Sequence, residues 1–372
     1  MRKKQFWLFL VLATGVWGLF LAMPQPASAK ATQAVTWYQQ WRRTYVGGKT
    51  QKYVRANDGQ GATTAYSEGQ GYGMLAAVLA AKQGANTHAI FNQFYRYYRA
   101  HRVASKVPLM AWRQTMRQGK LTSVGSEKNS ATDGDLDIAY ALILADKRWG
   151  SRQTNYRQAA KSLLAAIYKR EINPTTKLPL MGNWATSAYD QSKVRTSDLV
   201  PGYFKVFAKF TKNKGWQAVA TRSQKLIKKL SARHKTGLFP DFIRVTGTGL
   251  ALTAVKAYEI ESATDNQVGY NANRVPWRLA QSYQLTKNAT IKRALTKQLT
   301  FFKKRQKVLS GYTLSGRAVQ SYGDAAFVAP VNVAARVLKQ TSLKKRTGKQ
   351  LPKTIQKKNY YSGTLQMLCA LS

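Results

Sequence analysis

Residues 131–145 read ATDGDLDIAYALILA, in which three acidic residues at alternate positions lead into a run that is apolar on every side. Residues 67–81 read SEGQGYGMLAAVLAA and place one acidic residue and three glycines ahead of a similar apolar run. A helix that is apolar all round must be covered by protein on every face. We therefore expect residues 71–81 and 136–145 to form doubly buried helices, with the acidic residues where each helix begins.

Three other segments have one apolar face and one charged face. Residues 216–232 place Trp216 and Leu230 on a face that the lysines largely avoid, and residues 153–170 and 288–305 follow the same pattern. Such helices lie between a core and solvent. Roughly eleven or twelve helices of these two classes, with few and short strand patterns, predict an all-α fold of two concentric helix layers.

The composition describes a folded protein with an unusual charge. The chain has 372 residues, of which 44% are hydrophobic, and its 60 Lys and Arg face 15 Asp and Glu for a formal net charge of +45. A disordered basic tail would contain far fewer apolar residues. One cysteine, Cys369, excludes a disulfide framework, and three histidines leave little room for a metal centre. The motifs imply no cofactor and no metal.

The N-terminus is typical of an exported protein. Basic residues 2–4 precede an apolar run over residues 6–23, which ends before Ala27-Ser28-Ala29. This pattern predicts a signal peptide over residues 1–29, cut after Ala29, and a single domain over residues 30–372. An uncleaved anchor is the alternative, because the apolar run is close to the length of a membrane span. Either way, the domain is expected outside the cytoplasm.

The predicted export limits which partners the basic charge could attract. The Lys and Arg residues are spread along the chain instead of forming one arm or stripe, and short runs such as residues 344–346 stand out only slightly. We therefore expect no nucleic-acid partner. A basic surface outside the cell favours electrostatic association with anionic polymers, such as those of a cell wall, or with membrane headgroups. We expect a monomer.

The acidic residues are few enough to consider one by one. Glu68 precedes a buried helix, where burial would raise the pKa of its carboxyl and suit it to general acid chemistry, although a role as a cap or turn residue is the alternative. In residues 131–144 a calcium loop is excluded, because Ile138 and Leu144 stand where Gly and Glu are needed. We expect Thr132 or Asp133 to cap the helix, and three acidic residues are more than capping requires.

These two acidic segments resemble the two signatures of glycoside hydrolase family 8. Further matches follow in the family's order, and they are PGYFKVF (201–207), GLFPD (237–241), YNANRVPWR (270–278) and AAFVAP (325–330). The resemblance covers about residues 36–370. It implies an (α/α)6 barrel of six inner and six outer helices, with a sugar-binding cleft across one end. It also implies endo-hydrolysis of a β-1,4-linked polysaccharide with inversion at the anomeric carbon.

Inversion requires two carboxyl groups with different tasks. One is protonated at the leaving oxygen and the other activates water, roughly 6.5–9.5 Å away. By motif match, the resemblance implies that Glu68 is the general acid. Asp133 matches the family residue that holds the sugar ring at the cleavage point, and Asp135 is expected to support it.

The general base departs from part of the family. Many members carry Asp after the tyrosine that matches Tyr270, whereas this chain has Asn271, whose amide cannot take a proton from water. A second branch also has Asn and draws its base from a pattern resembling Glu-x-x-x-Asp-x-x-x-x-Tyr-Asn. Glu261 fits that spacing and is the predicted base, with Glu259 and Asp265 as alternatives. Without a base, the protein would be a catalytically impaired polysaccharide-binding protein.

Aromatic rings and polar groups complete the predicted site. Sugar rings present C–H faces that pack on aromatic side chains, while arginine and amide groups bind hydroxyls. The candidates are Trp112, Trp184, Tyr203, Tyr270, Asn271, Arg274 and, with least support, Trp277. Each aromatic residue has packing in the core as its alternative.

The substrate is inferred from charge. Relatives in the branch with the loop base include β-glucanases and chitosanases. Chitosan is a polycation that this basic chain would repel at long range. The sequence therefore favours a β-1,4-linked glucan, either cellulose-like or mixed-linkage, with chitosan as the alternative.

Overall fold

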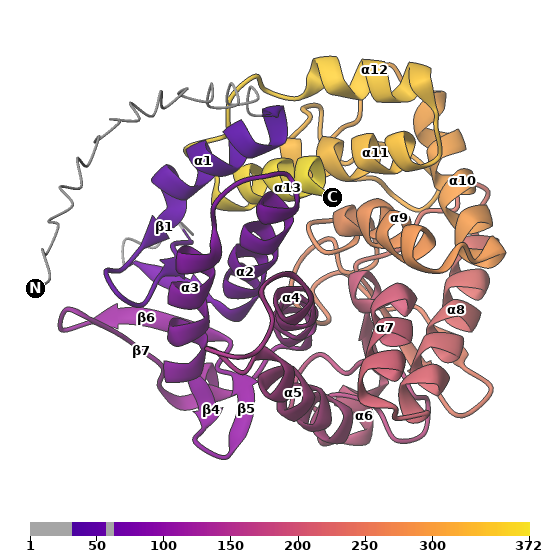
Figure 1. Cartoon of the computed structure of the whole chain (residues 1–372). Coiled ribbons are helices and arrows are strands. Elements are labelled where there is room, and N and C mark those ends of the chain that lie inside the picture. The colour runs from indigo at the N-terminus through magenta and orange to yellow at the C-terminus, as the bar shows by residue number, and fades with distance from the viewer. Residues whose placement is uncertain (1–31, 57–62) are drawn as a thin grey trace, which may run out of the picture. The chain divides into compact units, whose positions relative to one another are not determined.

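Six helices form a closed inner ring (Figure 1) in the computed structural model, which describes residues 32–56 and 63–372. The ring consists of α2 (Ser67–Lys82), α4 (Thr132–Trp149), α7 (Pro201–Thr211), α9 (Val275–Thr286), α11 (Ala325–Val337) and α13 (Tyr360–Leu371). Each helix contacts the next, and α13 contacts α2 to close the ring. The predicted signal segment lies outside the described residues.

Six further helices surround this ring (Figure 1). They are α1 (Gln33–Tyr45), α3 (His88–Ala100), α5 (Tyr156–Arg170), α8 (Gly215–Arg233), α10 (Ala289–Lys303) and α12 (Thr341–Gln350). Each packs on one inner helix, with α1 on α13 and the others on the inner helix that precedes them in the chain. The predicted (α/α)6 barrel is confirmed. A short helix, α6 (Ala188–Ser192), lies outside the two layers.

The connections between the helices differ in length at the two ends of the barrel. Short turns join α2, α4, α7, α9 and α11 to the outer helices that follow them, so these partners are antiparallel. Longer connections lead from each outer helix to the next inner one, and these carry the strands. The strands are β1 (Val46–Gly47), β2 (Tyr53–Val54), β3 (Thr64–Tyr66), β4 (Arg102–Ala104), β5 (Val107–Met110), β6 (Arg113–Arg117), β7 (Lys120–Thr122), β8 (Lys193–Arg195), β9 (Phe242–Thr246) and β10 (Ala251–Thr253).

Antiparallel pairing organises these strands into small sheets. The orders are β1-β2, β3-β6-β7, β4-β5 and β10-β9-β8. In the β8-β9 pair, Arg195 lies opposite Phe242, and in the β3-β6 pair, Tyr66 lies opposite Arg113. All the inner helices therefore begin at the end of the barrel that carries the sheets, and a site at this end is built from connections and helix N-termini.

The two predicted buried helices are α2 and α4, and glycines allow them to touch. A β-carbon at Gly134 would come within 2.6 Å of the Ser67 carbonyl carbon, and one at Gly71 would come within 2.9 Å of the Gly134 oxygen. The expectation that Thr132 or Asp133 caps α4 is wrong. Ala131 occupies the N-cap position, where no side chain accepts a capping hydrogen bond.

The amphipathic predictions correspond to α5, α8 and α10. The predicted segment 153–170 begins three residues early, because the Asn155 side chain accepts a hydrogen bond from the Gln158 amide and starts α5 at Tyr156. None of the helices within residues 32–56 and 63–372 has the length and apolarity needed to cross a bilayer.

Candidate active site

A cleft of about 420 Å³ lies where the inner helices begin. It is lined by Tyr66, Ser67, Glu68, Trp112, Ala131, Asp133, Arg195, Glu261, Tyr270, Asn271, Arg274 and Tyr361. A second hollow of about 430 Å³ shares Trp112, Ala131, Arg195 and Glu261 with it and extends to Met181 and Trp184. The two hollows share one wall and offer an elongated surface, as a polymer chain requires.

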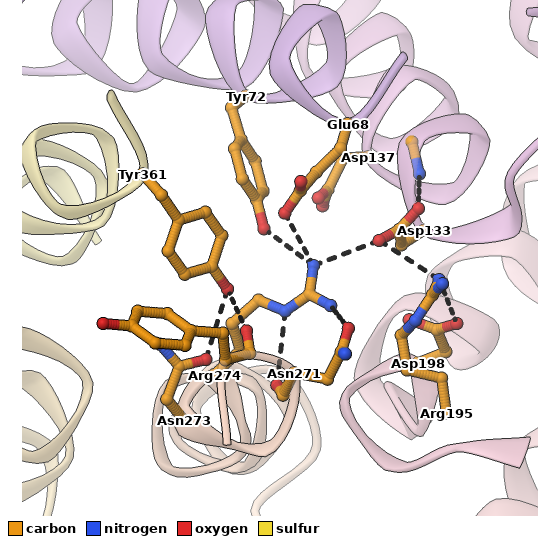
Figure 2. Close-up of polar contacts among 12 residues, drawn as sticks. Glu68, Tyr72, Asp133, Asp137, Arg195, Asp198, Asn271, Asn273, Arg274 and Tyr361 are labelled. Carbon is orange, nitrogen blue, oxygen red and sulfur yellow. Dashed lines mark hydrogen bonds and ion pairs between the residues drawn. The ribbon is translucent and has the colours of Figure 1, made fainter. Parts of the chain in front are cut away.

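The Arg274 guanidinium joins the predicted acid to the predicted sugar-holding residue (Figure 2). Its Nη1 donates to Glu68 Oε1 at 2.7 Å and to Asp133 Oδ2 at 3.1 Å. Its Nη2 donates to Asn271 Oδ1 at 2.9 Å. Arg274 is only 2% exposed, so these charge-assisted bonds are shielded from water.

Glu261 is connected to the same group of side chains from the other side. Asn271 Nδ2 donates to Glu261 Oε2 at 3.0 Å, and Arg195 Nη2 donates to Glu261 Oε1 at 3.0 Å. Arg195 Nη1 lies 3.3 Å from Asp133 Oδ2. Arg274, Asn271, Glu261, Arg195 and Asp133 thus form a closed polar ring, and Glu68 attaches to it through Arg274. Each member is held by two neighbours, which fixes the orientation of the carboxylates.

The two carboxyls beside Arg274 have pKa values shifted in opposite directions. Burial raises the pKa of Glu68, an effect that Arg274 opposes and the nearby Asp133 charge reinforces. Burial acts on Asp133 in the same sense, but Arg195 and Arg274 together bring its pKa below the ordinary value. Glu68 is therefore suited to carry a proton, while Asp133 stays ionised beside it.

Asp135 does not line the cleft. It is wholly buried, and its Oδ1 accepts a hydrogen bond from the Met110 amide at 2.9 Å. Burial and the neighbouring Glu171 raise its pKa well above the ordinary value, and burial raises the pKa of Glu171 to about 8. Asp135 therefore does not contact the substrate directly. Its position agrees with the expected role of supporting Asp133.

The expectation that Tyr203 contacts sugar is wrong. Tyr203 is 1% exposed, its ring is stacked on Tyr140 with centroids 3.9 Å apart, and its hydroxyl donates to Asp137 Oδ1 at 3.1 Å. Trp277 is likewise fully buried, 4.1 Å under the Arg278 guanidinium. Both residues lie in the core of the barrel, which was the alternative for each aromatic residue.

The loop that carries Glu261 separates the three candidate bases. Asp265 is buried and accepts hydrogen bonds from the amides of Ile260, Glu261 and Ser262 at 2.6, 2.9 and 2.8 Å. Glu259 forms an ion pair with Arg244 at 3.3 Å, outside the cleft. Glu261 is the one of the three that lines the cleft, and Asp265 shapes the loop that presents it.

Asp241 fixes the segment that presents Asn271, a role that the sequence did not reveal. Its carboxylate accepts hydrogen bonds from the amides of Gly269, Asn271 and Ala272 at 2.9, 3.2 and 2.6 Å. Burial raises the pKa of Asp241 to about 7, and these hydrogen bonds oppose that rise. The residue stands in the quoted motif GLFPD, so the resemblance pointed to the segment without indicating its task.

Two further residues of the cleft escaped the sequence analysis. Arg195 stands in no quoted motif, and only the pairing of β8 with β9 brings it beside Asp133 and Glu261. Tyr361 lies in the first turn of α13, and its hydroxyl donates to the Tyr270 carbonyl oxygen at 2.6 Å. Neither residue carries a local signal, because each reaches the site through contacts that are remote in sequence.

Three of the predicted aromatic residues do reach the cleft. Trp112 lines both hollows, and its ring is stacked on Tyr66 with centroids 5.8 Å apart and an interplanar angle of 11°. Trp184 is 37% exposed and Tyr270 is 44% exposed. Such surfaces suit the apolar faces of sugar rings. Within the described residues, no group of three or more His, Cys, Asp or Glu side chains is arranged to hold a metal ion.

Comparison with known proteins agrees with this geometry. The family model for glycosyl hydrolases family 8 matches residues 11–372. The chain belongs to glycoside hydrolase family 8. This family 8 chain is therefore a glycosidase, and its barrel and cleft are those of a sugar-cleaving enzyme.

Individual relatives are similar over most of this family 8 chain. A beta-glucanase of Niallia circulans is 34% identical over 307 residues, which cover 80% of this chain and 73% of the relative. Endoglucanase C of Ruminiclostridium cellulolyticum is 30% identical over 349 residues, which cover 90% and 69%. The apo structure of a beta-1,3-1,4-glucanase from Paenibacillus sp. X4 superposes with a TM-score of 0.83 at 29% identity and covers 93% of each chain.

Proposed function

We propose that this enzyme is a secreted, endo-acting hydrolase that cleaves β-1,4-linked glucan with inversion at the anomeric carbon. Glu68 acts as general acid and Glu261 as general base. The observation that carries the proposal is that these two carboxyls line one cleft. No hydrogen bond joins them directly, and the Arg274 guanidinium and the Asn271 amide lie between them on one side of the polar ring. Two intervening side chains leave room for the water that an inverting mechanism places between substrate and base.

The reaction assigns one proton transfer to each carboxyl. Glu68 donates its proton to the glycosidic oxygen as the bond from that oxygen to the anomeric carbon breaks. Glu261 takes a proton from water, whose oxygen bonds to the anomeric carbon from the opposite face. Asp133, ionised and held by Arg195 and Arg274, binds the sugar ring at the cleavage point. Glu68 and Glu261 regain their starting states by proton exchange with solvent.

A neutral glucan suits the cleft better than chitosan. The curated relatives described above are named as glucanases, and the site's buried guanidiniums, Arg195 and Arg274, together with the formal charge of +45, disfavour a polycation. Exposed Trp184 and the paired rings of Tyr66 and Trp112 offer apolar surfaces for several glucose rings. Cellulose-like and mixed-linkage chains are both compatible with these contacts.

Removal of either carboxyl tests the proposal. A reducing-sugar assay compares soluble cellulose derivative, mixed-linkage β-glucan and chitosan with the native enzyme, Glu68→Gln and Glu261→Gln. We expect each variant to lose about 10²–10⁴-fold in kcat, because general acid or base assistance contributes that much. NMR of the first products should show the α-anomer, as inversion of a β-linkage requires.

Glu259→Gln is the matched control, since Glu259 lies two residues from Glu261 but faces Arg244. It should retain most of the activity. Unchanged hydrolysis by Glu261→Gln would reject this residue as the base. Preferred turnover of chitosan would replace the glucan substrate, and glucan binding without turnover by the native chain would identify a binding protein instead.

A further inference from the structure

The end of the barrel opposite the cleft is a distinct surface. The cleft residues Glu68, Asp133, Arg274 and Tyr361 lie in the first turn of an inner helix or directly before it. The inner helices therefore end at the opposite face, which we call the back face. Because α2 has 16 residues and α4 has 18, the back face lies about 24–27 Å from their beginnings.

Exposed lysines mark the ends of five of the six inner helices. Lys82 ends α2, Lys147 lies in the last turn of α4, and Lys212, Lys287 and Lys339 follow the ends of α7, α9 and α11. We call these five residues the back-face lysines.

The back-face lysines lack a matching set of acidic residues. Of the acidic residues in the described chain, Asp146 in α4 is the one near these helix ends. Its Oδ2 already pairs with Arg157 at 2.8 Å, and its side chain is 7% exposed. Burial and repulsion from Lys147 lower the pKa of Lys82, as expected where like charges gather. The back face therefore carries an excess of cationic over acidic side chains.

Three of these lysines stand at a backbone position that does not favour lysine. Lys212, Lys287 and Lys339 have φ values of +61°, +53° and +55°. This left-handed region at a helix end normally holds glycine or asparagine, because a β-carbon is strained there. The helix α4 follows that rule and ends at Gly150, with φ of +74°. A favourable interaction with the helix dipole accounts for a cation in the last turn, but it does not require a lysine at the strained position.

The exposed apolar side chains of the protein indicate which kind of molecule could bind the back-face lysines. In the described chain, the exposed large apolar side chains are Val124, Trp184, Tyr189, Tyr258, Tyr270 and Tyr322, which lie in the connections, and Leu285 near the end of α9. A surface that inserts into a membrane needs apolar side chains to enter between the lipids. A surface for unpaired nucleic acid needs aromatic rings on which bases stack. A cationic surface with one exposed leucine suits a partner that offers charge alone.

We propose that the back face binds a linear phosphate polymer and thereby holds the enzyme on an anionic matrix with its cleft directed away from that matrix. Lysines spaced around the ends of the inner helices match a flexible chain with repeated single charges, which can reach several ammonium groups in turn. The binding leaves the cleft open, because the two surfaces lie at opposite ends of the same helices.

The test measures binding of the purified chain to immobilised poly(glycerol phosphate) at about 50 and about 200 mM salt, the range over which charge contacts weaken most visibly. The central variant is the triple Lys212→Asn, Lys287→Asn and Lys339→Asn. At about fivefold per lysine, we expect its Kd to rise on the order of 100-fold at low salt. Its Tm should stay equal or rise, since asparagine tolerates the left-handed conformation. A purely structural role for these lysines would lower Tm and leave binding intact.

Two matched variants test whether the loss of binding is specific to charge on the back face. Arginine at the same three positions keeps the charge and should keep the binding. The triple Lys161→Gln, Lys225→Gln and Lys345→Gln removes an equal charge from exposed positions on outer helices and should change Kd less than about threefold. Equal losses in the asparagine and glutamine triples would overturn the back face as the site. Tighter binding to phosphatidylglycerol vesicles or to oligo(dT) than to the phosphate polymer would overturn the choice of partner.

Discussion

Asn271 is the residue at which the two halves of the candidate site meet. Its Oδ1 accepts a hydrogen bond from Arg274, and its Nδ2 donates one to Glu261. A neutral amide can satisfy a cation on one side and a carboxylate on the other, whereas a carboxylate has no hydrogen to donate. The amide that cannot serve as a base thus orients the residue proposed to be the base.

Asn271→Asp tests this coupling. The variant places a carboxylate within hydrogen-bond distance of Glu261, where like charges repel. We expect kcat to fall at least about tenfold and the acid limb of the pH–rate profile to move to higher pH, because the added charge favours protonation of the pair. Asn271→Ala, which removes the donor without adding charge, should lower kcat without that shift. An unshifted acid limb in Asn271→Asp would contradict the coupling.

The elements α2 and α4 show how far the sequence leads. Their apolar runs predicted burial on every side, and burial on every side with amphipathic neighbours predicted two layers. The acidic residues Glu68 and Asp133 could be found because they stand beside these runs in long motifs. Tyr203 and Trp277 were misjudged because an aromatic residue near a helix N-terminus can face either the cleft or the barrel core. The orientation is set by packing, as the stack on Tyr140 shows.

The contacts of the polar ring could not be predicted from the sequence for a different reason. Arg274 and Glu68 are 206 positions apart, and Arg195 and Glu261 are 66 apart. Their contacts depend on the register of β8 with β9 and on closure of the helix ring. Neither the register nor the closure has a local signature in hydrophobic periodicity.

The three acidic residues at the start of α4 join different parts of the barrel. Asp133 reaches the cleft and Asp135 accepts from Met110, while Asp137 is paired through both oxygens with Arg278 of α9. Positions two apart on a helix differ in direction by a little over half a turn, so Asp135 faces away from the other two, whereas Asp133 and Asp137 lie on one face with Asp137 one turn further along the helix. This is why capping could not explain the segment.

Asp137→Asn tests the link between α4 and α9. Asp137 is fully buried and Arg278 is 4% exposed, so the variant leaves a guanidinium charge without its partner in the core. We expect the free energy of unfolding to fall by about 3–5 kcal/mol in urea titrations. The double variant Asp137→Leu with Arg278→Met, which removes both charges, should lose less. A change below about 1 kcal/mol in Asp137→Asn would show that the pair does not stabilise the barrel.

Acidic and basic side chains occupy different parts of the described structure. No outer helix contains an acidic residue, and within residues 32–56 and 63–372 Glu261 is the one acidic side chain classed as exposed. Other acidic residues are buried, capping or paired with Lys or Arg, as Glu127 is with Arg117 at 2.9 Å. The basic excess of the sequence is therefore a property of the outer surface, and the few acidic residues are concentrated in the cleft and the core.

The buried pair Asp135 and Glu171 makes the stability of the whole molecule depend on pH. Because the folded-state pKa of Glu171 is raised to about 8, the folded protein binds more protons than the unfolded chain between the ordinary Glu pKa and about 8. The free energy of unfolding should therefore fall as pH rises through this window. We expect Glu171→Gln to flatten the decline of Tm between about pH 5 and pH 8.

Glu127→Gln is the control, because the folded protein lowers the pKa of Glu127 where it raises the pKa of Glu171. Its contacts with Arg117 lower the pKa of Glu127 to about 2, so it contributes stability that is lost only as pH falls below the ordinary Glu range. This variant should leave the slope of Tm between about pH 5 and pH 8 unchanged. A native-like slope in Glu171→Gln would show that the buried pair does not set the alkaline loss.

Because α13 closes the inner ring, the active site can be completed only late in synthesis of the chain. The helix that lies between α11 and α2 consists of residues 360–371, and its Tyr361 forms part of the cleft wall. A nascent chain that has emerged as far as α12 holds every carboxyl of the polar ring but has an open gap beside α2. Hydrolysis must therefore await the emergence of α13, because the inner ring and the cleft wall are incomplete without it.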